Sequence, residues 1–369
     1  MNQLFRWDQM GLFLLALAAG ILPFAVPEVC AAALQEGLTL CSGPLLLSLF
    51  PFLVVSRLLV QCPESDMLAL PFRLAAWGIG IRTPCAARVL CIGFLGGFAP
   101  AASAAAQAVR TGQLTAEEAD ALLPACICSG PSFVVLTVGQ SLLGSAELGV
   151  LLFAAQITAN YLTAALLNRF AGVRSVKSGS AAPPSPAPPQ LDEILADAAI
   201  TYCKLCGFIL FFRMLAAGAG ALLPAGAGTL CAILLEVCSG CDLASRTGRW
   251  GSLLCCAALS VQGLSVLLQV RTICPPEMTL RPLYRARMLH LPLSLALFYL
   301  LLPGGEADVF STLPARVLLM RRVPPDCALL VFAVCCMAAC TLRSGIRQVE
   351  QKQMARNAGG CCIKSKTLL

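Results

Sequence analysis

The chain has 369 residues, of which 58% are apolar and 12% are charged. Soluble domains carry roughly a quarter charged residues, so a soluble globular domain is excluded and an all-α, polytopic membrane protein is predicted. The net charge of +7 does not predict nucleic-acid binding, because lysine and arginine lie in the connections between apolar runs, where membrane proteins carry their orientation signals.

Residues 1–42 are predicted to form an N-terminal transmembrane helix, over residues 11–26, and a following loop. A signal peptide is the alternative, but no A-x-A-like cleavage site follows cleanly, which favours a retained helix. Residues 43–60 are long enough to span a bilayer at about 1.5 Å per residue, and Arg57 lies near their end. Residues 67–81 are weakly apolar and predict a helix in the membrane interface.

Two neighbouring apolar stretches between residues 93 and 138 are each interrupted at mid-length by small residues and proline. Non-helical backbone at membrane depth persists only where it is buried in protein or lines a wet cavity. Broken helices that face each other near the midplane are typical of a transporter's binding site, so this stretch predicts half of a solute site. The interrupting residues are Gly96, Gly97 and Pro100 in the first stretch, and Ser129, Gly130 and Pro131, followed by Ser132, in the second.

The connection between these two stretches contains Thr115 and Glu118 at the spacing of a capping box, which predicts the start of a helix. The acidic residues there are interpreted as a solvated first turn rather than as a cation site. Residues 148–167 are predicted to span the membrane. Residues 172–190 are rich in Ser, Pro and Gly, which predicts an extended linker between two halves, with a partner-docking site as the alternative.

The second half repeats the pattern of apolar segments. These lie at residues 200–223, 229–243, 253–270, 288–302 and 327–342, with a short ambiguous segment at 313–320. The single histidine, His290, is interpreted as a helix-end residue rather than a catalyst. The predicted units are therefore 1–42, a first repeat at 43–170, a cytoplasmic linker at 171–198, a second repeat at 199–302, a C-terminal membrane region at 303–342 and a basic cytoplasmic tail at 343–369.

A weak internal repeat relates the two halves. Three pairs of segments align: residues 52–59 with 208–215, 95–100 with 235–240, and 129–132 with 262–265. The positive-inside rule then gives the halves opposite orientations, apart from Arg316, Arg321 and Arg322, which do not fit. We expect about eight transmembrane helices and two re-entrant or broken hairpins in two inverted-topology halves.

Six short motifs follow one another along the chain. They are F-P-F-L-V-V-S-R, L-G-G-F-A-P, L-T-A-E-E-A-D-A-L-L and C-S-G-P-S-F-V in the first half, and L-L-E-V-C-S-G and Q-G-L-S-V-L-L-Q-V in the second. Over residues 45–270 this order resembles the sporulation integral membrane proteins that carry a Gate, or nucleoside-recognition, domain. The resemblance implies a transporter of dipicolinic acid in the outer forespore membrane. Gate domains also occur in nucleoside transporters, so a nucleoside-type solute is one alternative, and a non-transporting scaffold for spore morphogenesis is another.

Two arginines at matching positions of the halves, Arg57 and Arg213, suit a small organic anion, because a guanidinium binds carboxylates through a planar fork. Arg57 could instead extend to the membrane interface. Glu236 is predicted to hold Arg213 when the site is empty. The predicted substrate-binding set is Arg57, Gly96, Gly97, Ser129, Gly130, Pro131, Ser132, Arg213, Glu236, Ser239, Gly240, Gln262, Gly263 and Ser265.

Enzyme activity is not expected, since the chain has no H-E-x-x-H, G-x-S-x-G or Walker A motif. The 21 cysteines lie mostly inside apolar runs, where Cys acts as a small hydrophobe, so no metal or cofactor is expected. The expected partners are the anionic solute and the lipid bilayer, without nucleic acid; assembly into a homo-oligomer is left open.

Overall fold

The computed structural model describes residues 2–61, 67–171 and 191–302. Within them the regular structure is entirely helical, with fourteen α-helices, a π-helix and a 3-10 helix. The predicted all-α class is therefore confirmed. The predicted linker at 172–190 and the segments at 313–320, 327–342 and 343–369 lie outside the described residues.

The first half contains the helices up to α8, and two of its segments are each divided by a short break. Its elements are α1 (Asn2–Ala25), α2 (Pro27–Ser42), α3 (Pro44–Gln61), α4 (Leu70–Gly78), α5 (Pro84–Gly96), α6 (Phe98–Arg110), α7 (Ala116–Cys126), the π-helix η2 (Ser132–Leu142) and α8 (Ala146–Ala171).

The second half begins with the longest helix and then also has two divided segments. Its elements are α9 (Leu191–Leu222), α10 (Ala225–Leu235), α11 (Val237–Ser245), the 3-10 helix η3 (Gly248–Trp250), α12 (Gly251–Val261), α13 (Gly263–Ile273) and α14 (Arg281–Leu301).

Long apolar helices indicate a multi-pass membrane protein. In the described residues, three segments are long and apolar enough to cross a bilayer: Ala146–Ala171, Leu191–Leu222 and Gly248–Ile273. The α1–α2 pair, bent by 110°, makes a fourth if it is counted as one span. Most of the remaining helices are shorter than the roughly 20 residues that a straight span needs, because the breaks divide several apolar runs into halves. The helix α14 has 21 residues but is not among the spans that are apolar enough.

One sequence-based assignment is wrong in this region: residues 27–42, assigned to a loop, form α2. Pro27 occupies the first turn, where its missing N–H is not needed, and Glu28 follows it in the same turn. The run Cys-Ala-Ala-Ala-Leu-Gln-Glu then supplies strong helix formers.

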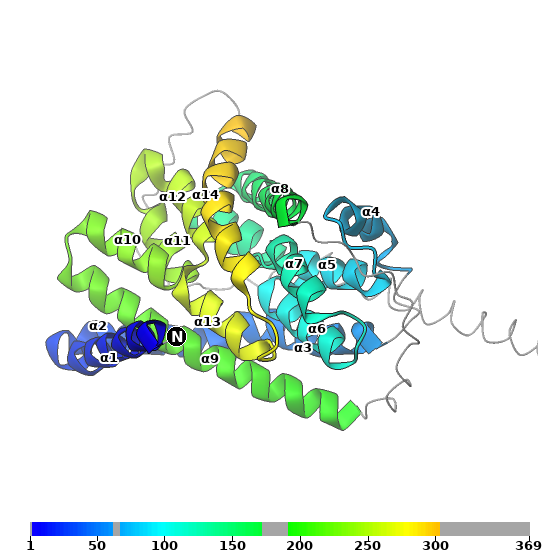
Figure 1. Ribbon diagram of the computed structural model, residues 1–369. Coiled ribbons are helices and arrows are strands. Elements are labelled where there is room, and N and C mark those ends of the chain that lie inside the picture. The colour runs from blue at the N-terminus through cyan, green and yellow to red at the C-terminus, as the bar shows by residue number, and fades with distance from the viewer. Residues whose placement is uncertain (1, 62–66, 172–190, 303–369) are drawn as a thin grey trace, which may run out of the picture.

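The two halves share one core (Figure 1). The helix α9 runs along one side of the molecule and packs against α2, α3, α10 and α13, while α14 packs against α7, α8 and α12. The largest cluster of buried apolar residues contains side chains from both halves, such as Ala105 and Leu122 with Cys256 and Leu259. Most of the described cysteines are buried.

Candidate functional site

The two breaks of the first half touch each other. We call them the first break pair: Gly97 between α5 and α6, and residues 127–131 between α7 and η2. Gly97 has φ +81, and a Cβ there would lie 2.7 Å from the backbone nitrogen of Gly130. Gly97 therefore lets two backbones approach to a distance that no side chain would allow.

The second half repeats this arrangement. Its second break pair consists of Glu236, between α10 and α11, and Gln262, between α12 and α13, with Gly263, the first residue of α13. Gly263 has φ +71, and a Cβ there would lie 2.8 Å from the backbone nitrogen of Glu236. The structure thus brings together the segments that the internal alignment matched, with the breaks at the small or polar residues that predicted them.

Glu236 caps the start of α11. Its two carboxylate oxygens accept hydrogen bonds from the backbone N–H groups of Cys238 and Ser239, at 2.8 and 2.7 Å. The carboxylate is buried, and the positive end of the helix stabilises it. The predicted direct pair with Arg213 is not formed: the Arg213 guanidinium instead donates to Glu36 on α2, at 2.6 Å.

The other predicted residues of the breaks play backbone and packing roles. Gly96 lies against Pro100, and Gly240 lets α11 approach the backbone of Ile233 on α10. The hydroxyl of Ser265 accepts a hydrogen bond from Gln269, at 2.9 Å. Of the rest, Ser129 and Gln262 are buried, Pro131 is half-buried, Ser132 is exposed at the start of η2 and Ser239 contributes its backbone N–H to the Glu236 cap.

Arg57 lies in a pocket between the two halves. Its guanidinium donates to Asp197 at 2.6 Å, to Thr201 at 3.2 Å and to Ser103 at 3.3 Å. The Arg57 side chain is only 9% exposed, whereas that of Asp197 is 60% exposed. The guanidinium of Arg57 is therefore turned inward and held by α6 and α9.

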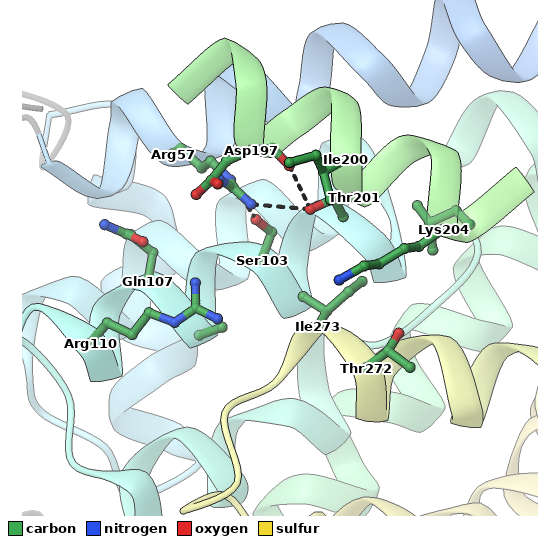
Figure 2. Close-up of a pocket in the computed structure, with 12 residues that line it drawn as sticks. Arg57, Ser103, Gln107, Arg110, Asp197, Ile200, Thr201, Lys204, Thr272 and Ile273 are labelled. Carbon is green, nitrogen blue, oxygen red and sulfur yellow. Dashed lines mark hydrogen bonds and ion pairs between the residues drawn. The ribbon is translucent and has the colours of Figure 1, made fainter. Parts of the chain in front are cut away.

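The pocket carries an excess of positive charge. It has a volume of about 130 Å³, and its wall is built from α3, α6, α9 and the end of α13. Figure 2 shows the Arg110 guanidinium and the Lys204 amine pointing into the same space as Arg57. Three cationic side chains thus face one carboxylate, that of Asp197, so the lining suits a small anion.

A buried polar cluster, which no sequence motif predicted, joins the two halves. Gln156 on α8 donates to the carbonyl of Cys256 and to the hydroxyl of Ser260, at 3.2 and 3.0 Å. The hydroxyl of Ser260 also lies against that of Ser294 on α14. His290 is buried in the middle of α14, with Nε2 3.2 Å from the Gln156 carbonyl, so its interpretation as a helix-end residue is wrong.

Arg287 is the charged member of this cluster. Its guanidinium donates to the carbonyl of Ile127, in the first break pair, at 2.5 Å and to the carbonyl of Ser260, near the second, at 3.3 Å. In the sequence, Arg287 is one of four arginines between residues 271 and 287. A guanidinium that contacts backbone carbonyls has no local sequence signature, so only the fold could reveal it.

Comparison with known proteins gives no relative. No protein-family model, no curated protein and no solved structure matches this chain. The resemblance to Gate-domain sporulation proteins therefore rests on the motifs alone.

Proposed function

We propose that this chain is a multi-pass membrane transporter of a small organic anion. The observation that carries the proposal is the pocket between the halves, where Arg57, Arg110 and Lys204 surround one exposed carboxylate. Because the Arg57 guanidinium already points into the pocket, a solute carboxylate can replace the carboxylate of Asp197 with little movement of the protein. Both carboxylates accept hydrogen bonds from the same planar guanidinium N–H groups.

The two break pairs support transport rather than passive anchoring. A protein that only had to span lipid would gain nothing from four interrupted helices, which leave backbone groups without helical partners. Paired breaks packed in one core are the arrangement on which alternating-access carriers depend. In keeping with it, we propose about eight spans with the two halves in inverted orientation.

Dipicolinic acid is the solute that we propose first, and the outer forespore membrane the location, both on the strength of the motif resemblance. Dipicolinate carries two carboxylates on a small ring, which fits a pocket of about 130 Å³ with three cations better than an uncharged nucleoside does. A scaffold role would leave the charge of this pocket without a purpose.

The test is uptake by proteoliposomes that contain the purified chain, with radiolabelled dipicolinate and uridine as solutes. We expect dipicolinate uptake above that of empty liposomes, and its loss by about ten-fold or more in Arg57→Gln. Arg73→Gln is the matched control, because Arg73 is exposed on α4 and lies over the Trp77 ring.

Uptake of uridine without dipicolinate would replace the proposal with the nucleoside-type alternative. Uptake of neither solute by correctly inserted protein would overturn transport of both kinds and favour the scaffold. Equal dipicolinate uptake by the Arg57 and Arg73 variants would mean that the pocket takes no part in transport.

A further inference from the structure

Two anchors fix how α14 lies along α7. The Asp120 carboxylate, on α7, accepts hydrogen bonds from the backbone N–H groups of Thr279 and Leu280, at 2.8 and 3.1 Å, and Leu280 directly precedes the first residue of α14. Further along, Ile127 at the end of α7 accepts from Arg287. Both intervals are seven residues long (120 to 127 and 280 to 287), so the two helices run side by side in the same direction over about 10 Å.

This arrangement places the Arg287 guanidinium against two helix C-termini. Ile127 follows the last residue of α7, and Ser260 lies in the last turn of α12. Carbonyl groups in the last turn of a helix have no partner within the helix and carry the negative end of its dipole. Arg287 contacts one such carbonyl from each half of the molecule.

The charge of Arg287 has no carboxylate partner among the described residues. The residue is only 8% exposed, and its Nε is buried without a hydrogen bond. A buried charge without a counter-ion is costly. Here the compensation comes from backbone carbonyls alone, and this is also how proteins hold a bound sodium ion.

In transporters with broken helices, unwound carbonyls and the C-terminal ends of half-helices coordinate the coupling cation. We infer that Arg287 is a tethered cation at such a position, so that this chain holds its two break pairs together without binding sodium. This inference rests on the proposed transport function and adds to it the mode of coupling: solute movement is independent of sodium, and the permanent charge of Arg287 is a part of the site.

The first experiment compares charge with shape. Arg287→Lys keeps a cation and Arg287→Met keeps a similar length without one. In sodium-free choline buffer, wild-type uptake should equal that in sodium within about two-fold, Arg287→Lys should stay within a few-fold of wild type, and Arg287→Met should lose about ten-fold or more. Arg285→Met is the control, because Arg285 is exposed on the same helix. Wild-type uptake that requires sodium, or Arg287→Met as active as Arg287→Lys, would overturn the inference.

The second experiment does not need transport. Arg287→Ala leaves a space for a free cation, so millimolar guanidinium chloride should raise the melting temperature of the purified variant and leave that of wild type unchanged. A melting temperature that guanidinium raises equally in both proteins, or in neither, would contradict a cation site. If the wild-type protein transports no anion, but guanidinium raises the melting temperature of Arg287→Ala alone, then the proposed transport function is wrong and the cation site is supported.

Discussion

The two break pairs solve the same geometric problem with different chemistry. In the first pair the contact is between glycines, Gly97 against Gly130, and neither α6 nor η2 has a side-chain cap at its start. In the second pair Gly263 allows the approach, and the Glu236 carboxylate caps α11. Of the four helix starts at the breaks, three are therefore open and one is already filled by an anion.

This difference makes the two break pairs chemically unequal. Helix starts without a side-chain cap leave N–H groups that attract negative charge, and both α6 and η2 start in this way. In the second pair Glu236 already satisfies those donors. We therefore expect stability to depend on the backbone conformation of glycine in the first pair, and on the charge of Glu236 in the second.

The largest effect should come from Gly97→Ala. With φ +81 and ψ −164, Gly97 occupies a region that only glycine readily adopts, and the new Cβ would meet the nitrogen of Gly130. We expect the free energy of unfolding to fall by about 3 kcal/mol or more, measured by thermal unfolding in detergent. Gly207→Ala on α9 faces open space and should be neutral or stabilising. Equal stability of the two variants would refute the close backbone contact.

Glu236→Ala should have the next largest effect. It removes both hydrogen bonds to the start of α11, and loss of such a cap costs about 1–2 kcal/mol. The same unfolding assay measures it. Glu147→Ala is the control, because Glu147 is an exposed residue in the first turn of α8, where a carboxylate contributes only about 0.3–1 kcal/mol. If Glu236→Ala were no worse than this control, the cap would not distinguish the second pair from the first.

A smaller effect concerns the partner of Arg213, which sequence and structure assign differently. Double-mutant cycles should give a coupling of about 0.5–1 kcal/mol for Arg213 with Glu36, because the Glu36 side chain is 58% exposed and the pair is screened. The coupling of Arg213 with Glu236 should be weaker, since Glu236 directs both oxygens to the backbone. The reverse order would restore the pairing expected from the sequence.

The smallest effect should follow deletion of residues 183–189 from the linker. The halves are held together by their shared core, and a change in loop length costs little free energy. Uptake should stay within a few-fold of wild type. Complete loss of uptake, with normal insertion in the membrane, would mean that the linker does more than connect the two pairs.

The sequence predicted those features that depend on local chemistry. Small residues and proline marked the breaks at Gly97 and at residues 129–131, and the capping box at Thr115 and Glu118 forms as expected. The aligned positions of the second half marked the breaks at Glu236 and Gln262. In each case the residue at the helix end also has the backbone conformation or the side chain that allows the helix to end there.

Features that depend on distant contacts could not be predicted in this way. The partners of Arg57 and Arg213 are on other helices, 140 and 177 residues away in sequence. Arg287 reaches Ile127 across 160 residues, and neither residue type indicates the other. A carbonyl acceptor can belong to any residue, so pairing by charge sign, which suggested Glu236 for Arg213, misleads where the backbone is the partner.

The matched seven-residue intervals on α7 and α14 set a rule for how this chain can vary. A single residue inserted between Leu280 and Arg287 would turn the guanidinium by about 100° around the helix axis, away from both carbonyls, even if every side chain were kept. Substitutions along these intervals leave the spacing intact, whereas a single-residue insertion in either helix breaks it. The lengths of these two segments should therefore stay fixed, while the lengths of the connecting loops can change freely.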